Sequence, residues 1–219
     1  MSDLFIEVEE ALKQERLEKI WREYGGIILG LLAMIILATA SNAGYHAWIE
    51  YRNNQQTNQF LNVLNQADAT TEDFLAIREG MTAGMKSIVN MHAAKLALDN
   101  ADKEKALAIY RYIKSDSAQE KANPTFAALA KYMIISIDDT LSTDDKIAAY
   151  ETIAQDKNNP WRYNALLEAA LLEARHNKNY AKARLHLAPI FTINASAPKG
   201  LKQKAQSLDI LYQAQQSDD

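Results

Sequence analysis

The chain has 219 residues, with 24 Lys and Arg against 28 Asp and Glu, and it contains no cysteine. The lack of cysteine excludes disulfides, cysteine-ligated zinc and a thiol nucleophile. After position 48 the acidic and basic residues are interspersed and nearly equal in number, whereas a nucleic-acid-binding protein needs a strongly basic surface. We therefore expect no nucleic-acid partner.

Residues 1–24 form an acidic segment with seven acidic and four basic residues. Apolar side chains recur along it as an imperfect stripe, which predicts a helix over 3–23. We interpret 1–24 as a cytoplasmic amphipathic segment, either a solvated helix beside a membrane or a specific docking motif.

Residues 25–48 are 24 residues without a formal charge. As a helix this stretch would be about 36 Å long, which exceeds the roughly 30 Å hydrocarbon core of a bilayer. Aromatic side chains, which favour the headgroup level, lie at both edges. The predicted edges of this transmembrane helix are Trp21, Tyr24, Gly25, Trp48 and Tyr51.

Two other interpretations fit part of this pattern. Ala38-Thr39-Ala40 has the form of a signal-peptide cleavage site, but a signal peptide normally begins with a short, net positive segment. A buried core helix that is apolar on all faces would need a larger protein around it than the remaining chain readily provides. We favour the membrane span.

The basic residues predict the orientation of this span. Lys13, Arg16, Lys19 and Arg22 precede it, whereas only Arg52 follows closely. Because Lys and Arg accumulate on the cytoplasmic side, we expect a cytoplasmic N-terminus and, in a bacterial inner membrane, a periplasmic C-terminal domain.

Small residues share one face of the predicted span. Gly26 and Gly30 are four residues apart, as are Ala40 and Gly44. Such pairs let helix backbones approach closely, so a second span could pack on this face. The oligomeric state stays open.

Few helix breakers follow the span, with three glycines and four prolines, so we predict an all-α protein. Residues 49–80 are expected to be a helical linker, and residues 81–219 a helical repeat domain. The span is expected to continue as a helix towards Gln66, and a short helix to open at Thr71 and end at Gly80.

Within 81–219 the pattern predicts three helix pairs, 81–100 with 102–115, 124–137 with 144–155, and 160–176 with 180–187. Asn123-Pro124 and Asn159-Pro160 each offer an amide N-cap followed by proline at the first helical position. In the second helices, Tyr110 with Ile113 recurs as Tyr150 with Ile153 and as Leu187 with Ile190. A helix-turn-helix unit with this period is typical of a stacked array.

One repeat carries an alanine four residues before an aromatic residue, Ala106 and Tyr110, as tetratricopeptide second helices do. We therefore predict a tetratricopeptide-like domain. Pro189 is expected to end or kink its helix, and residues 198–215 to form a C-terminal capping helix.

No motif in the chain predicts catalysis. The four histidines, His46, His92, His176 and His186, have no metal-ligand spacing on one helix. We expect no enzyme activity, no cofactor and no metal. First helices of an array line a concave face that mixes aromatic and charged groups; the predicted partner-binding residues there are Asn90, Lys131, Tyr132, Arg162, Tyr163 and Glu168.

The layout resembles a known family. The resemblance rests on residues 22–26 (Arg-Glu-Tyr-Gly-Gly), 48–52 (Trp-Ile-Glu-Tyr-Arg), 159–163 (Asn-Pro-Trp-Arg-Tyr) and 197–201 (Ala-Pro-Lys-Gly-Leu). With the span and the helical repeats, these resemble the ancillary SecYEG translocon subunit family of single-pass inner-membrane proteins. The resemblance implies a periplasmic tetratricopeptide-like domain that associates with translocon subunits, periplasmic chaperones or client chains, and it carries over no catalytic residues.

The expected function is therefore that of a membrane-anchored protein-protein interaction protein, an ancillary subunit linking the Sec translocon to periplasmic chaperones. Two alternatives stay open. One is a scaffold for envelope or cell-division complexes, and the other is a membrane-tethered hydrolase that uses His176 or His186.

Overall fold

The computed structural model describes residues 2–119, 124–192 and 195–217. These residues contain nine helices and no strand, which confirms the all-α prediction. The chain divides into two compact units, Met1–Gln56 and Thr57–Asp219. The boundary therefore falls inside the predicted linker, and each unit is described by itself below.

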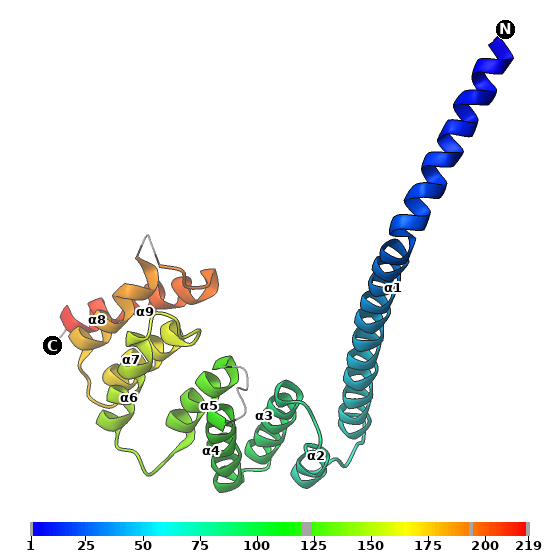
Figure 1. Ribbon diagram of the computed structural model, residues 1–219. Helices are drawn as coiled ribbons and strands as arrows, with labels where there is room; N and C mark the ends of the chain where they lie inside the picture. Colours follow the sequence, from blue (N-terminus) through cyan, green and yellow to red (C-terminus); the bar gives the residue numbers. More distant parts are fainter. Residues whose placement is uncertain (1, 120–123, 193–194, 218–219) are drawn as a thin grey trace. The chain divides into compact units, whose positions relative to one another are not determined.

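The first helix, α1 (Ser2–Leu64), is one continuous helix that contains the predicted span (Figure 1). It begins at Ser2, before the predicted span, and ends at Leu64, inside the predicted linker. Its residues up to Gln56 form the first unit, and the remaining turns belong to the second.

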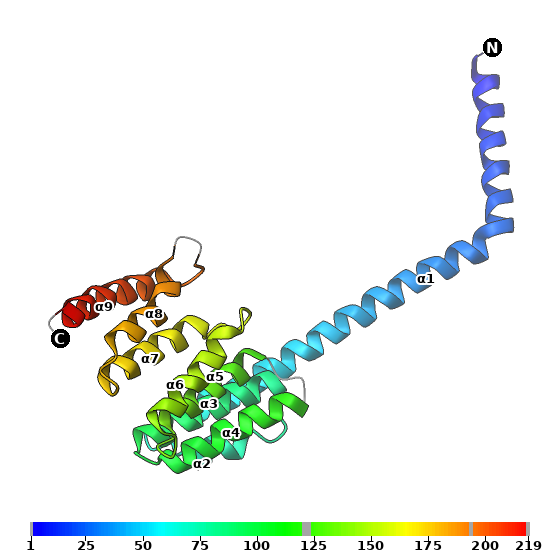
Figure 2. The same cartoon turned by 90° about the vertical axis from the view of Figure 1, so that its left-hand side faces the viewer.

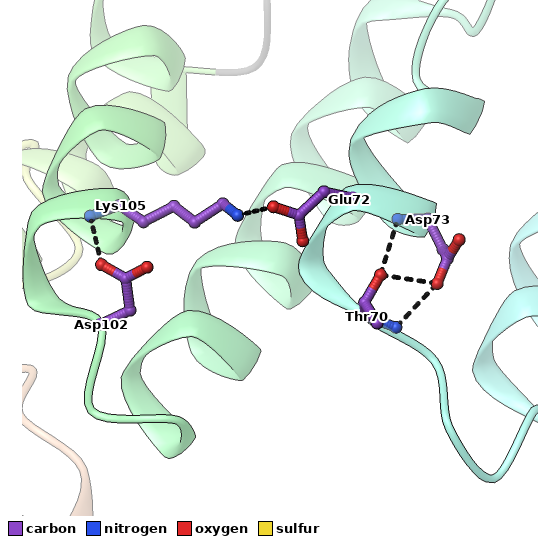
Figure 3. A network of polar contacts seen from close by, with 5 residues as sticks. All are labelled: Thr70, Glu72, Asp73, Asp102 and Lys105. Carbon is purple, nitrogen blue, oxygen red and sulfur yellow. Dashed lines mark hydrogen bonds and ion pairs between the residues drawn. The ribbon is translucent and has the colours of Figure 1, made fainter.

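The short helix α2 (Thr71–Ile77) begins with a capping box. The Thr70 backbone amide donates to the Asp73 carboxylate over 2.8 Å, and the Asp73 amide donates to the Thr70 hydroxyl. An ion pair joins Glu72 of α2 to Lys105, and the Lys105 amide donates to Asp102 over 3.0 Å (Figure 3). These contacts fix the start of α2 against the start of α4 (Lys103–Gln119).

The C-terminal turns of α1 are part of the core of the second unit. Val63 is buried together with Phe74 of α2 and Val89 of α3 (Ala83–Asp99). The rings of Phe60 and Phe74 are 5.8 Å apart, and both lie against His92, at 5.7 and 4.5 Å. Burial lowers the pKa of His92, because an apolar environment disfavours the charged imidazolium.

Successive helices of the second unit pack side by side, and Figures 1 and 2 both show α7, α8 and α9 lying next to one another. The helices after α4 are α5 (Pro124–Ile137), α6 (Thr143–Gln155), α7 (Arg162–Arg175), α8 (Tyr180–Phe191) and α9 (Lys199–Ser217). Their cores form three clusters in a row, and neighbouring clusters share α5 or α7. Most contacts between helices are therefore made by neighbours along the chain.

The positions that recur in the sequence are buried. Tyr110, Tyr150 and Leu187 are 3%, 2% and 0% exposed, and the isoleucines three residues after each of them are equally covered. Ala94 and Ala106 are both fully buried in the cluster shared by α3 and α4. Small side chains at this position permit a close approach of the two helices.

Two ion pairs fix the C-terminal end of α5 to α4. Arg111 donates to the buried Asp138 over 3.0 Å, and Lys103 donates to Asp139 over 2.5 Å. Hydrogen bonds from the Thr140 hydroxyl and amide hold the pKa of Asp138 below its usual value, with a smaller contribution from Arg111. Asp138 therefore stays ionised in the fold at neutral pH.

One predicted helix start was wrong. Pro160 does not begin α7, because the Asn159 carboxamide accepts the Trp161 amide over 2.9 Å in a turn, and the helix begins at Arg162. Pro189 lies inside α8, which continues to Phe191, so the helix does not end at the proline itself. A kink at Pro189 stays a prediction. Proline has no amide hydrogen, so the carbonyl of Leu185, four residues earlier, lacks its usual helical partner. Leu185 is 72% exposed, so water can reach this part of the helix. Asn123, the other predicted N-cap, lies outside the described residues.

Candidate functional site

The apolar stretch of α1 exposes its side chains in every direction. The four consecutive residues Met34 to Leu37 are between 61% and 67% exposed, and four residues complete more than one helical turn. This helix is long and apolar enough to cross a membrane. Within its own unit this stretch is exposed, as a membrane-spanning helix would be.

The far edge of this stretch carries an aromatic and cationic cluster. Tyr45 and Trp48 have ring centroids 6.4 Å apart, and the Arg52 guanidinium lies 5.6 Å from the Trp48 ring. These three residues share one helix face. At the near edge the Trp21 ring covers Gly25, since a methyl group there would lie 3.4 Å from the ring. Tyr24 and Tyr51 are exposed, as are Trp21 and Trp48, whereas Gly25 is buried under the Trp21 ring.

The small residues of the span leave their helix face open. A methyl group added at Gly26, Gly30 or Gly44 would meet nothing within 4 Å, and Ala40 is exposed. Packing of a second span on this face stays a prediction.

Two of the predicted partner-binding residues, Tyr132 and Glu168, lie together and are joined by a hydrogen bond. Tyr132 of α5 lies in contact with Tyr150 of α6 and with Trp161, at ring distances of 5.4 and 6.1 Å. Burial raises the pKa of Tyr132, and a hydrogen bond to the Glu168 carboxylate adds to this shift. Burial raises the pKa of Tyr150 to about 12. This aromatic cluster therefore joins α5, α6 and α7. The hydroxyl groups of Tyr132 and Tyr150 stay protonated and can donate hydrogen bonds.

Two other predicted residues are interior. Asn90 is 1% exposed and belongs to the core of α3, so its side chain does not lie on an accessible face. Tyr163 is 9% exposed, and its hydroxyl accepts the Ser196 amide over 3.1 Å. The Arg162 guanidinium lies 4.9 Å from the Tyr163 ring, and Lys131 is half-buried. The accessible part of the predicted face is thus Lys131, Tyr132, Arg162 and Glu168.

Trp161 was not among the predicted partner-binding residues. Its ring stacks on Tyr132, and its buried Nε1 has no hydrogen-bond partner among the described residues. A tryptophan in the turn next to Arg162 was the available signal, because interfaces are enriched in Trp, Tyr and Arg.

The described residues contain no group of three His, Asp or Glu side chains placed to hold a metal ion. His176 follows α7, and His186 lies in α8, where its Nε2 is 3.6 Å from the Glu151 carboxylate. What the arrangement offers is a set of fixed aromatic and charged groups on a helical scaffold, which suits protein recognition. The sequence matches no protein-family model, no curated protein and no solved structure.

Proposed function

We propose that this chain is a single-pass membrane protein whose helical domain binds other proteins and performs no catalysis. The observation that carries the proposal is the exposure of a full turn of apolar side chains, Met34 to Leu37, in a helix that continues into the core of the second unit. Outside a membrane this surface would be in water, which is unfavourable for so many large apolar groups.

The N-terminus of the proposed topology is cytoplasmic, and the domain lies on the opposite side, which is the periplasm in a bacterium. Lys13, Arg16, Lys19 and Arg22 before the span support this orientation. The span holds the domain at the membrane and so raises its effective concentration near membrane-bound partners.

The helical domain of this proposal is a tetratricopeptide-like array. Support comes from the sequential packing of α3 to α9 and from the burial of Tyr110, Tyr150 and Leu187 at recurring positions. The packing of α9 against α8 and α7 fits a capping helix, because it covers apolar surface at the end of the array.

The specific role in this proposal is that of an ancillary subunit that links the Sec translocon to periplasmic chaperones. The resemblance of the layout supports this role. The test is crosslinking in native bacterial membranes followed by mass spectrometry. Recovery of translocon subunits and chaperones would support it, whereas recovery of division proteins without the translocon would replace it with a scaffold role.

The anchor has a separate test. A reporter fused to the C-terminus should be active only in the periplasm, and the mature protein should retain its first residues apart from the initiator Met. A cytoplasmic reporter, or a mature chain beginning at Ser41, would contradict the proposed anchor. Turnover by the purified protein that is lost on substitution of His176 or His186 would contradict the absence of catalysis.

A further inference from the structure

A surface pocket lies between α7, the loop after it, and α9. Its volume is about 520 Å³, which is within the range of ligand-binding pockets. Leu171, Leu211, Tyr180 and Tyr212 form its apolar part, and the two tyrosine rings are 5.8 Å apart. Leu211 is 50% exposed, so a large apolar group at the pocket is accessible to a ligand.

The polar part of the pocket is cationic. Arg175, His176 and Lys178 line it and are exposed. The side chains of Arg175 and Lys178 form no ion pair or hydrogen bond with any residue that the structure describes. The one acidic side chain in the lining, Glu168, is engaged by Tyr132.

The combination of these two parts defines the ligand. A guanidinium and an ammonium without acidic partners attract carboxylates, and Arg binds them with two parallel hydrogen bonds. A large apolar group on the ligand would remove the most surface of the adjacent leucine and tyrosine side chains from water. A small inorganic anion would leave this apolar wall uncovered, and a purely apolar ligand would leave the cations without a counter-charge.

We propose that this pocket binds a short acidic peptide segment of a partner protein, with one apolar side chain against Leu211 and Tyr180 and carboxylates at Arg175 and Lys178. This inference rests on the proposed protein-binding function and names the chemistry of its partner. Glu168 belongs to both the pocket and the predicted partner-binding face, so the pocket extends that face towards α9.

The test uses the full chain in phosphatidylcholine nanodiscs and the fluorescein-labelled peptide Gly-Glu-Asp-Leu-Phe-Asp-Glu-Gly, with binding measured by fluorescence anisotropy. We expect saturable binding that weakens as NaCl rises from about 50 to about 500 mM. A peptide with Gln and Asn in place of Glu and Asp should bind at least about tenfold more weakly.

Charge reversal locates the site. Arg175→Glu combined with Lys178→Glu should weaken peptide binding at least about tenfold. The matched control, Lys157→Glu combined with Lys204→Glu, makes the same charge change at exposed positions outside the pocket and should change binding less than about twofold. Helical content measured by circular dichroism should be the same in both variants.

Three outcomes would overturn the inference. These are no binding of the peptide, equal binding of its uncharged counterpart, or equal weakening by the two double variants. Binding of phosphatidylglycerol vesicles through the same cations, without binding of the peptide, would assign the pocket to lipid instead.

Photocrosslinking in membranes separates this inference from the proposed function. A photoreactive residue at Leu211 should capture proteins. Capture from Ile88 of α3, which is 41% exposed, without capture from Leu211 would reject the pocket and leave the protein-binding function in place. Capture from neither position, together with no partner in the crosslinking experiment above, would reject both.

Discussion

Replacing Phe74 tests whether the C-terminal end of α1 is packed into the helical domain. Phe74 is 1% exposed, and its ring lies 5.8 Å from Phe60 and 4.5 Å from His92. Burial of such a side chain contributes about 1.5–3 kcal/mol, and two aromatic pairs add about 0.5–1.5 kcal/mol each. The total agrees with the cost of about 3–5 kcal/mol for Phe→Ala changes in protein cores. Phe74→Ala should lower the free energy of unfolding by this amount.

For a unit of this length, Thr57–Asp219, that loss corresponds to a Tm lower by about 6 to 20 °C. Far-ultraviolet circular dichroism of the full chain in detergent measures this change, and hydrogen exchange should show faster exchange in residues 57–64. The control is Leu185→Ala at a 72% exposed position, which should change the stability by less than about 0.5 kcal/mol. A shift under about 2 °C in Phe74→Ala, or equal shifts in both variants, would refute the packing argument.

Three further predictions concern the span, an ionised carboxylate and a buried hydroxyl. Leu37→Arg should raise the free energy of membrane insertion by about 3–4 kcal/mol and lower the membrane-integrated fraction in a carbonate-extraction assay, whereas Leu61→Arg, beyond the span, should not. Hydrogen bonds lower the pKa of Asp138 in the fold, so its carboxylate stabilises the protein above about pH 4 and this contribution is lost as the pH falls through the folded pKa. Asp138→Asn should therefore lower the Tm at neutral pH but reduce the further loss on acidification from about pH 5 to about pH 2; parallel melting curves of the two proteins over that range would contradict this. Tyr132→Phe removes the hydroxyl that bonds Glu168 and should lower the free energy of unfolding, measured in urea, by about 1–2 kcal/mol. An unchanged free energy of unfolding would show that this hydroxyl is exposed to water instead.

The helices could be predicted because their residues have strong local preferences. Few breakers interrupt 81–219, and the regular recurrence of apolar residues predicts α3 to α9 to within a few residues at most ends. The predicted start of α7 was wrong because an Asn side chain can accept a hydrogen bond either as a helix cap or within a turn. In the structure Asn159 accepts the Trp161 amide within a turn. Sequence patterns alone do not distinguish between these uses.

Contacts between distant residues were harder to predict. Asn90 was expected on the concave face that the first helices of an array line, but its neighbours in the fold cover it almost completely. The contact of Trp161 with Tyr132, and the meeting of Arg175 with Leu211 in one pocket, depend on how helices pack. Periodicity assigns residues to helix faces but does not say which faces meet.

The continuity of α1 restricts where the helical domain can be separated from the apolar stretch of that helix. Proteolysis within residues 65–69 would separate Phe60 and Val63 from the helical domain and leave the ring of Phe74 partly uncovered. A recombinant fragment that begins there would have the same defect. A cut before Thr57 would retain both side chains on their own helical turns. A soluble fragment of this protein should therefore begin inside the first helix, several residues before the first loop.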